Sequence, residues 1–371
     1  MNFRPSHWET TTFLQPTQTL IVGAGLTGLQ TALRLKKSNP NHDILVVERN
    51  AIPRGASTRN AGFACFGGPT ELLADLDDNG AGAMVATVRQ RYAGIKALEA
   101  GFAHRGVDWA ANGGYEIIDD PATEATVRQR LPELNALLAE VTGRAQTWHI
   151  TTPLNGIFTL HNTLEAQLHP GKLVEVLLAD CRRAGVRLLF GAAVTEVRGD
   201  GVTVADHGAV TADQVILTVN AFARRLLPEA FAEEIRPVRN QVLLSRPLPG
   251  LRLRGCYHYH EGYVYFRNVG EDRLLIGGAR HLAGSRSETD AFGPNQEVAD
   301  QLIDRLRRWL PAYDLGPEDF PVRWSGIIAQ GGDKTPVLRR TESGILVAGR
   351  LAGMGVALSA DLARRAAALV E

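Results

Sequence analysis

Hydrophobic and polar positions change their spacing abruptly near the start of the chain. Residues 20–22 form a continuous apolar run, which predicts a buried parallel strand. After a glycine-rich turn, apolar residues recur at helical spacing through residues 26–35, which predicts an amphipathic helix. A second apolar run at residues 44–47 predicts another strand. Strand, turn, helix and strand in this order are typical of half of a doubly wound α/β sheet.

The rest of the chain shows two alternating kinds of pattern. Residues 75–148 have helical spacing, whereas residues 236–280 alternate with period two between turn residues, which predicts antiparallel strands. Residues 169–228 predict a helix, a strand, a hairpin and a strand, and residues 345–370 predict a strand, a glycine loop and a helix. The chain has 371 residues. A single core rarely grows beyond ~250–300 residues, so we expect two domains.

Composition and charge argue against several classes of binding partner. Hydrophobic residues make up 44% and charged residues 22%, as in ordinary globular proteins. The 40 basic residues equal the 40 acidic ones, so charge gives no case for binding nucleic acid or a membrane. The three cysteines are widely spaced, without a metal-ligand pattern, which favours a reduced compartment. The first twenty residues contain no apolar core of signal-peptide length, so we expect a cytoplasmic protein.

The first turn has the spacing of a dinucleotide site. Gly23, Gly25 and Gly28 form GxGxxG, in which the glycines permit a tight turn, approach of a pyrophosphate and close helix–strand packing. The N-terminus of the helix would offer N–H groups to the phosphates. Glu48 ends the second strand twenty residues after Gly28, where an acid accepts hydrogen bonds from the adenosine ribose. The motif alone leaves NAD and FAD open.

A third stretch, GASTRNAGFACFGG at residues 55–68, keeps its side chains small, as if a ligand approached the backbone. Together with LIVGAGLTGLQTALRL and ILVVERN, it resembles the N-terminal region of the flavin-dependent D-amino acid oxidase superfamily. That group includes glycine oxidase, sarcosine oxidase and gamma-glutamylputrescine oxidase. The segments at 169–228 and 344–370 agree with it in order. The resemblance implies FAD, bound non-covalently because the matching segments lack cysteine and histidine.

The resemblance also implies a fold. We expect a discontinuous Rossmann-like α/β FAD-binding domain and a second, α+β domain with a large mixed or antiparallel sheet covered by helices, its other face turned to the flavin. The FAD-binding domain would comprise residues 15–75, 151–235 and 325–371. The substrate domain would comprise helices at 76–150 and the sheet at 236–324.

The resemblance also implies site residues, at the positions of this sequence that match the family's motifs. The cofactor-binding residues expected are Gly23, Gly25, Gly28, Glu48, Arg49, Ser57, Thr58, Arg59, Asn60, Gly62, Val194, Asn220, Arg350, Gly353 and Gly355. Ser57 and Thr58 would donate to phosphate, and Arg59 and Asn60 would reach the ribityl or pyrimidine side. The loop before the last helix would lie beside the flavin O2 carbonyl, where a helix N-terminus stabilises negative charge.

The tract CYHYHEGYVYF at residues 256–266 holds four tyrosines and two histidines. Aromatic residues favour strands in any case. The functional interpretation is an aromatic-walled pocket, which keeps an amine substrate neutral so that hydride can pass to flavin N5. The candidate catalytic residues are Tyr259, Tyr265, Arg280 and Trp324. No metal is expected, because no third ligand accompanies His258 and His260.

Two positions depart from the family pattern. Ile328 stands where glycine oxidases carry a carboxylate-binding arginine, and Leu275 stands where sarcosine oxidases carry an oxygen-activating lysine. Arg280, Arg323 or Arg350 could replace the first. The expected substrate is therefore a small amine or amino acid, and the electron acceptor is O2 or another compound.

Two other functions stay open. A 2-hydroxyacid dehydrogenase of the same superfamily would need a general base, for which His258, His260 and His281 are candidates. A non-catalytic FAD-binding subunit would keep the glycine motifs but have no use for the aromatic tract.

Overall fold

The computed structural model describes residues 5–370, which divide into two compact units. Unit 1 comprises the described residues up to Thr58, Pro170–Val238, and those from Ile327 onward. Unit 2 comprises Arg59–His169 and Arg239–Gly326. The chain therefore leaves unit 1 and returns to it twice. That unit 1 holds FAD and unit 2 the substrate stays a prediction.

The unit boundaries differ from those expected after residues 75 and 150. Two short strands, β3 (Phe63–Ala64) and β7 (Ala166–Gln167), pair with each other inside unit 2. Strand β6 (Phe158–Asn162) pairs with β4 (Gly114–Ile118) in the main sheet of that unit. Pairing between distant segments thus assigns residues 59–75 and 151–169 to unit 2, which local sequence patterns do not reveal.

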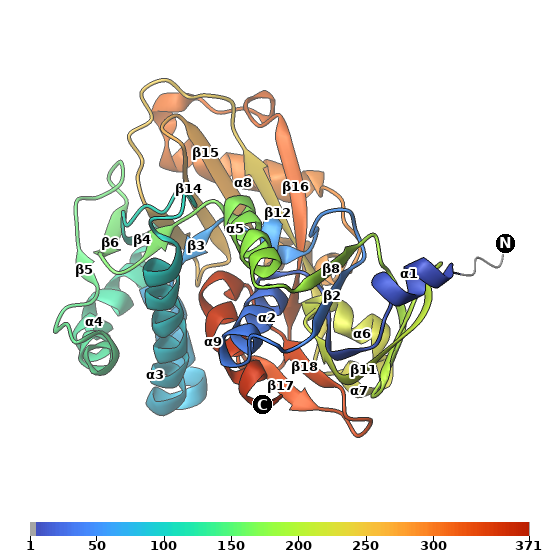
Figure 1. The fold of residues 1–371 in the computed structure, drawn as a ribbon. Helices are drawn as coiled ribbons and strands as arrows, with labels where there is room; N and C mark the ends of the chain where they lie inside the picture. The colour runs from blue at the N-terminus through green and yellow to red at the C-terminus, as the bar shows by residue number, and fades with distance from the viewer. Residues whose placement is uncertain (1–4, 371) are drawn as a thin grey trace. The chain divides into compact units, whose positions relative to one another are not determined.

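Unit 1 is built on a largely parallel sheet (Figure 1) with strand order β17-β18-β11-β1-β2-β8. Its strands are β17 (Val337–Arg340), β18 (Leu346–Gly349), β11 (Gly208–Leu217), β1 (Thr17–Val22), β2 (Ile44–Glu48) and β8 (Arg187–Phe190). The hairpin β9 (Val194–Arg198) and β10 (Gly201–Val204) continues from β11. Strand β2 is buried throughout, as its continuous apolar run predicts. The carboxyl ends of the parallel strands share one edge, where ligands bind in such sheets.

Three longer helices accompany this sheet: α2 (Leu26–Ser38), α5 (Pro170–Arg183) and α9 (Gly355–Ala368). Helices α2 and α9 pack side by side, joined by a hydrogen bond of 2.9 Å from Gln30 Nε2 to Ser359 Oγ. The shorter helices of the unit are α1 (His7–Thr12), η1 (Ala56–Thr58), η2 (Asn220–Phe222), α6 (Ala223–Leu226) and α7 (Pro228–Phe231). The N-termini of α2 and α9 both follow carboxyl ends of parallel strands, so their free N–H groups lie toward the ligand-binding edge.

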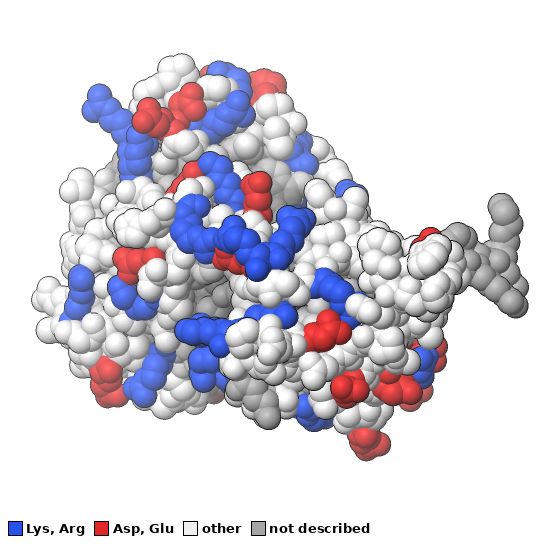
Figure 2. Space-filling model, viewed as in Figure 1, with Lys and Arg blue, Asp and Glu red and all other residues white. Residues whose placement is uncertain are grey.

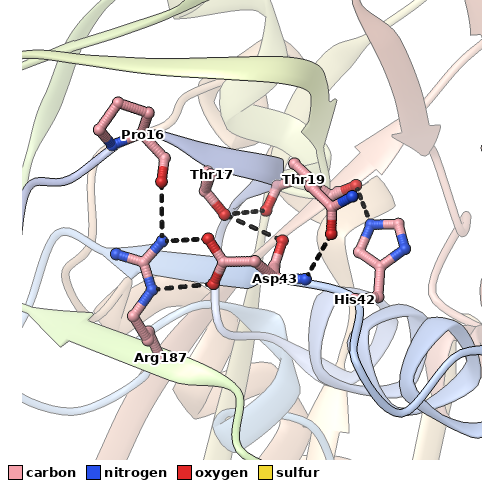
Figure 3. Close-up of polar contacts among 7 residues, drawn as sticks. Pro16, Thr17, Thr19, His42, Asp43 and Arg187 are labelled. Carbon is pink, nitrogen blue, oxygen red and sulfur yellow. Dashed lines mark hydrogen bonds and ion pairs between the residues drawn. The ribbon is translucent and has the colours of Figure 1, made fainter.

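Polar contacts tie together the opposite, amino-terminal edge of this sheet (Figure 3). Arg187 donates to both oxygens of Asp43, from Nε at 3.1 Å and from Nη2 at 2.8 Å. Thr17 Oγ1 donates to Asp43 O at 3.0 Å, and Thr19 Oγ1 lies 2.8 Å from His42 Nε2. The starts of β1, β2 and β8 are thus fixed to one another, away from the carboxyl ends.

Unit 2 contains an eight-stranded mixed sheet with order β16-β12-β15-β14-β13-β4-β6-β5. Its remaining strands are β16 (Val322–Gln330), β12 (Arg236–Leu244), β15 (Arg273–Gly278), β14 (Val264–Val269), β13 (Cys256–Tyr259) and β5 (His149–Ile150). The helices are α3 (Pro69–Phe102), which kinks at Gly80, α4 (Pro121–Thr142) and α8 (Gln296–Trp309), with the 3₁₀ segments η3 (Arg280–Ser287), η4 (Pro311–Tyr313) and η5 (Pro317–Asp319). The predicted fold class, a Rossmann-like α/β part and a large mixed sheet with helices, is confirmed.

Alternation along the strands gives the unit 2 sheet two distinct faces. On one, which we call the α8 face, Tyr257, Phe266 and Leu243 pack with the apolar side of α8. On the other, which we call the Tyr265 face, Tyr265 packs with Leu275. Successive residues of a strand point to opposite faces of the sheet. The register with which the strands pair therefore decides which side chains are in contact.

None of the helices in residues 5–370 is long and apolar enough to cross a membrane. Basic and acidic side chains both occur on the face of the molecule seen in Figure 2, as the balanced composition predicts.

Candidate active site

The glycine turn of unit 1 leaves no room for side chains. Gly23 has φ +105°, a conformation that residues with a Cβ rarely adopt. A Cβ on Gly28 would lie 2.2 Å from Gly23 O and 2.6 Å from Thr218 Oγ1. Thr218 Oγ1 lies 3.0 Å from Val22 O and 2.9 Å from Gly23 O, both of which are acceptors for its hydroxyl. Thr218, which the sequence analysis missed, follows the apolar strand β11 directly and fixes the turn.

Ser57 lies at the bare N-terminus of α2. Gly25 is the N-cap residue and has no side chain to cap the helix, so the backbone N–H of Leu26 donates to Ser57 Oγ at 3.0 Å. A Cβ on Gly25 would lie 2.9 Å from Ser57 Oγ. The neighbouring hydroxyl of Thr58 donates to Pro53 O at 2.7 Å and thus holds η1 in its loop. A helix N-terminus next to a hydroxyl donor suits a phosphate.

Glu48 supports the glycine turn from the end of β2. Its Oε2 accepts from the backbone N–H of Ala24 at 3.2 Å, and its Oε1 accepts from N and Nδ2 of Asn50, each at 3.2 Å. A carboxylate has about four acceptor positions, so some remain for ribose hydroxyls. The next residue, Arg49, places its guanidinium 4.0 Å from the centre of the Phe222 ring.

The loop between β18 and α9 has an unusual backbone. Arg350, Ala352 and Gly353 have φ values of +56°, +46° and +85°. Such conformations cost about 1–3 kcal/mol each in residues other than glycine and cluster at functional sites. Gly355 then begins α9 without a side-chain cap. Its N–H groups are therefore left for a ligand or water.

Asn220 connects the end of β11 to this loop. It has φ +49°, and its Oδ1 accepts from the backbone N–H of Leu351 at 3.3 Å. A Cβ on Gly349 would lie 3.2 Å from Asn220 Cα, so the two segments approach closely. Asparagine tolerates this conformation better than most residues, which explains how it can stand in place of a glycine turn.

The other predicted residues of unit 1 make protein contacts. Arg350 is 8% exposed, and its Nε and Nη2 donate to Thr335 O at 2.9 and 2.7 Å. Val194 begins β9 and packs on the unit 1 core. Ile328 is buried, with Cδ1 3.9 Å from the position of a Cβ on Gly353. These protein contacts do not test cofactor binding. The cofactor roles of Arg350 and Val194 therefore stay predictions.

Residues 59–62 are fixed against β16 within unit 2. Arg59 donates from Nε to Ser325 O at 2.5 Å, and Trp324 Nε1 donates to Arg59 O at 3.1 Å. Asn60 Oδ1 accepts from the backbone N–H of Gly62 at 2.8 Å, which shapes a tight turn at φ +76°. The predicted cofactor segment and the predicted catalytic Trp324 therefore lie together.

Tyr265 occupies the centre of its face of the sheet. Its ring centre lies 5.7 Å from that of Phe63, and a Cβ on Gly277 would lie 2.8 Å from its hydroxyl oxygen. Burial raises the pKa of Tyr265 to about 12, although the charge of Arg280 opposes this. The hydroxyl is therefore a proton donor at neutral pH. Arg280 lies with its guanidinium 4.4 Å from the centre of the Tyr263 ring.

The structure does not bring Tyr259 together with Tyr265. Tyr259 pairs with Val264, and its ring lies 4.8 Å from that of Trp309 on the α8 face. The residue paired with Tyr265 is instead His258. Tyr259 and Tyr265, both predicted as catalytic residues, therefore lie on opposite faces of the sheet, because alternate residues of a strand point to opposite faces.

His258 belongs to a buried group of polar side chains. Its Nε2 lies 2.8 Å from Glu165 Oε2, and Glu165 Oε1 accepts from the backbone N–H of Phe66 at 3.0 Å. Burial by itself lowers the pKa of His258, but the charge and hydrogen bond of Glu165, with nearby Glu116, raise it overall above its ordinary value. A raised pKa favours the charged form of the imidazole, which has no free lone pair to accept a proton.

Cys65, Glu165 and His258 are the group within residues 5–370 whose donor atoms are close enough for a metal, within 4.8 Å of one another. Burial raises the pKa of Cys65 far above its ordinary value, and the imidazole and carboxylate already bond to each other. The group thus has a direct explanation as a buried, hydrogen-bonded histidine–carboxyl pair beside a thiol.

These features allow a comparison of the whole chain with known proteins. Residues 18–369 match the model of the family described as DAO, FAD dependent oxidoreductase. The chain belongs to this family. No protein with a curated description matches it.

Several solved structures share the fold of this DAO family member. Glycine oxidase from Geobacillus kaustophilus has 19% identity and a TM-score of 0.77, covering 96% of this chain and 95% of that one. Iminodiacetate oxidase from Chelativorans sp. BNC1 has 17% identity and a TM-score of 0.77, covering 95% of both chains. L-Proline dehydrogenase from P. horikoshii has 16% identity and a TM-score of 0.74, covering 96% and 93%. The protein is thus an FAD-dependent oxidoreductase, and the close backbone approach at Gly25 and Gly28 fits a dinucleotide.

Proposed function

We propose that the protein oxidises a small amine or amino acid to an imine, which water then hydrolyses to a carbonyl compound and an amine. Bound FAD supplies the hydride acceptor, flavin N5. The observation that carries the proposal is the Tyr265 face, an apolar and aromatic surface whose central hydroxyl stays protonated at neutral pH. An amine in apolar surroundings loses its proton more readily, and only the neutral amine can release hydride from the adjacent carbon.

The residues of this face would position the substrate and exclude water. The Phe63 ring lies beside that of Tyr265, and both pack with Trp324 on the same buried apolar cluster. The Tyr265 hydroxyl would donate a hydrogen bond to a polar atom of the substrate, since its raised pKa keeps the proton on the oxygen. The chain needs no strong base for the reaction, because the apolar surroundings lower the pKa of the substrate ammonium, and its proton passes to water before hydride leaves the carbon.

The proposal includes FAD held without a covalent link. GASTRN at residues 55–60 and WSGIIAQGG at residues 324–332 contain neither cysteine nor histidine. Two helix N-termini, a hydroxyl at Ser57 and the carboxylate of Glu48 would instead hold the dinucleotide through hydrogen bonds. Denaturation in acid should release all of the flavin into the supernatant; colour that stays with the precipitate would contradict this part.

An anaerobic stopped-flow screen tests the function. The holoenzyme is mixed with primary amines, N-methyl amino acids, D- and L-amino acids, and 2-hydroxyacids, and bleaching of the flavin band is followed. We expect an amine or amino acid to bleach it, and Tyr265→Phe to slow bleaching by about tenfold or more. Tyr259→Phe is the matched control and should bleach at the wild-type rate. Bleaching by 2-hydroxyacids alone, or by nothing, would refute amine oxidation.

One observation keeps a 2-hydroxyacid dehydrogenase as the second candidate. Burial, together with the charges of His260, Arg305 and Arg280, lowers the pKa of His281 to about 4, so its imidazole is neutral and able to accept a proton. In that case His281→Gln should abolish bleaching by 2-hydroxyacids, whereas amine oxidation does not require this residue.

A further inference from the structure

Arg267 is a buried cation on the Tyr265 face of the unit 2 sheet. It lies between Tyr265 and Val269 on β14, and alternate residues of a strand share a face. Its register partner on β15 is Leu275, which packs on the same face. Only 7% of Arg267 is exposed. Because an arginine keeps its proton in proteins, a full positive charge is buried at this face.

Three backbone carbonyl groups hold the guanidinium of Arg267. Its Nε donates to Ala61 O at 2.5 Å, its Nη2 to Leu168 O at 3.0 Å and its Nη1 to Asn268 O at 3.3 Å. Among the described residues no carboxylate forms an ion pair with it. The positive charge is therefore stabilised by peptide dipoles, without a bonded counter-charge.

A second buried arginine, Arg91, shows the contrast. Arg91 is 1% exposed, and its Nη1 donates to Phe66 O and to Glu71 Oε1, each at 3.0 Å. A bonded carboxylate thus balances its charge. Burial lowers the pKa of Arg267, and Asp108 opposes this only through its charge, without a bond. A buried charge without a bonded partner costs free energy of folding, so a role other than stability would explain Arg267 better.

The bond to Ala61 O connects Arg267 to the predicted cofactor segment. The carbonyl of Ala61 and the N–H of Gly62 belong to one peptide group, and that N–H donates to Asn60 Oδ1 at 2.8 Å. The carbonyl of Gly62 accepts in turn from the backbone N–H of Leu168 at 2.9 Å. A charged donor polarises a chain of hydrogen bonds and strengthens the bonds beyond it. Arg267 thus fixes the turn that orients Asn60.

We propose that Arg267 is a positioning residue for the flavin: it holds residues 60–62 against the sheet and raises the reduction potential of bound FAD. The inference rests on the proposed function and on the expected contact of this segment with the ribityl or pyrimidine side of FAD. Uptake of hydride, which is two electrons and one proton, gives the neutral flavin ring one negative charge. A positive charge buried near the ring favours that reduced form, because Coulomb interactions are strong where water is excluded.

The reduction potential tests the charge of Arg267 directly. The FAD of the holoenzyme is reduced without substrate, by xanthine and xanthine oxidase, in equilibrium with a reference dye. Arg267→Gln keeps hydrogen-bond donors for the carbonyl groups but removes the charge. We expect reduction to become about tenfold or more less favourable, which equals about 30 mV for a two-electron couple.

Arg267→Lys separates the charge from the shape of the side chain. Lysine keeps the positive charge but not the planar fork, so the potential of this variant should lie closer to that of the wild type. Equal shifts in the two variants, or no shift in either, would overturn the inference. If Arg267→Gln does not retain FAD, the lysine variant decides, and a potential more than about 30 mV below that of the wild type contradicts the role of the charge.

Arg273→Gln is the matched control. Arg273 is a half-buried arginine of β15 whose Nη1 lies 3.5 Å from Ser245 O, and it does not bond to residues 59–62. Its loss removes one positive charge from the same sheet, and the potential should stay at the wild-type value. A drop as large as that of Arg267→Gln would show that the net charge of the sheet acts and not a charge placed at Arg267.

Hydrogen exchange of the holoenzyme tests the positioning part. Arg267→Gln should lose protection at the amides of Gly62 and Leu168, whereas Arg273→Gln should keep it. Unchanged protection in Arg267→Gln would show that this arginine does not hold the segment. A lowered potential in Arg267→Gln, with no bleaching of the wild-type enzyme by any amine, would refute the proposed function but keep the role of Arg267. Bleaching by amines, with a wild-type potential in Arg267→Gln, would refute the role of Arg267 alone.

Discussion

Gly28 is the residue at which the candidate FAD site tolerates least change. In Gly28→Ala the new Cβ would lie 2.2 Å from Gly23 O and 2.6 Å from Thr218 Oγ1, so α2 must move away from the end of β1. The helix N-terminus would then no longer be aimed at the pyrophosphate. We expect the FAD content of the purified variant, measured from the flavin absorbance per polypeptide, to fall about tenfold or more.

Gly82→Ala provides the matched control. Gly82 lies in α3, and a Cβ there would have nothing within 4 Å. Alanine is favoured over glycine in helices, so this variant should be up to about 1 kcal/mol more stable and keep full FAD content. Equal FAD content in the two glycine variants would show that the turn does not carry the cofactor.

Glu116 makes stability depend on pH. Burial raises its pKa to about 7, although Thr70 donates to the carboxylate from N at 2.9 Å and from Oγ1 at 2.5 Å. Between about pH 4.5 and 7 the folded protein then holds a proton that the unfolded chain has lost. This group therefore destabilises the fold as pH rises through that window, by up to about 1.4 kcal/mol per pH unit.

Glu116→Gln should remove this dependence. The difference in urea unfolding midpoint between variant and wild type should move in favour of the variant from pH 5 to pH 8. Glu175→Gln, which changes an exposed acid of α5, should give a difference that is constant with pH. A constant difference for Glu116→Gln as well would show that its carboxyl is already ionised at pH 5.

At the scale of elements, the sequence predicted strands and helices better than it predicted their faces. Apolar runs, glycine spacing and period-two alternation indicated β1, α2, β2 and the sheet of unit 2. The face of each strand depends on its register with partners far away in sequence, such as β13 with β4 and β12 with β15. For this reason the sequence indicated Tyr265 and Gly28 but missed Thr218 and Glu165, whose contacts come from other segments.

The loop before α9 is an element whose conformation depends on one side chain. Arg350 Nε and Nη2 both donate to Thr335 O, and Nη2 also bonds to Asp333 Oδ1 at 2.5 Å. Arg350→Ala would leave the strained residues from 350 to 353 without this anchor. We expect a loss of about 2–3 kcal/mol in the free energy of unfolding and faster hydrogen exchange in residues 331–336 and 350–354.

Asp333→Asn separates the two kinds of contact. The side chain of Asp333 is 59% exposed, so its ion pair with Arg350 is solvated and its loss should cost less than about 1 kcal/mol. The bonds to Thr335 O remain in this variant. If Asp333→Asn destabilises the protein as much as Arg350→Ala, the ion pair and not the backbone contact holds the loop.

At the scale of the whole molecule, the four crossings between units give each unit segments from separate parts of the chain. Unit 1 takes β1 and β2 from the start, β8 and β11 from the middle and β18 from the end. The parallel sheet of unit 1 is complete only when all three segments are present. A ligand bound at its carboxyl edge should therefore stabilise the whole unit against unfolding. The balanced charge, by contrast, gives the surface no strong preference for either sign of partner.

FAD should therefore stabilise the apoprotein against heat, and the two halves of the cofactor should do so unequally. A ligand present at 100 times its Kd adds about 2.7 kcal/mol to the free energy of unfolding. The glycine turn, Ser57 and Glu48 would contact the ADP half, so ADP should raise the unfolding midpoint measurably and FMN should raise it less, with FAD above both. In Gly28→Ala the shifts with ADP and FAD should shrink together. A larger shift with FMN than with ADP would show that the adenosine end does not bind at the glycine turn, and would move the cofactor site away from Glu48.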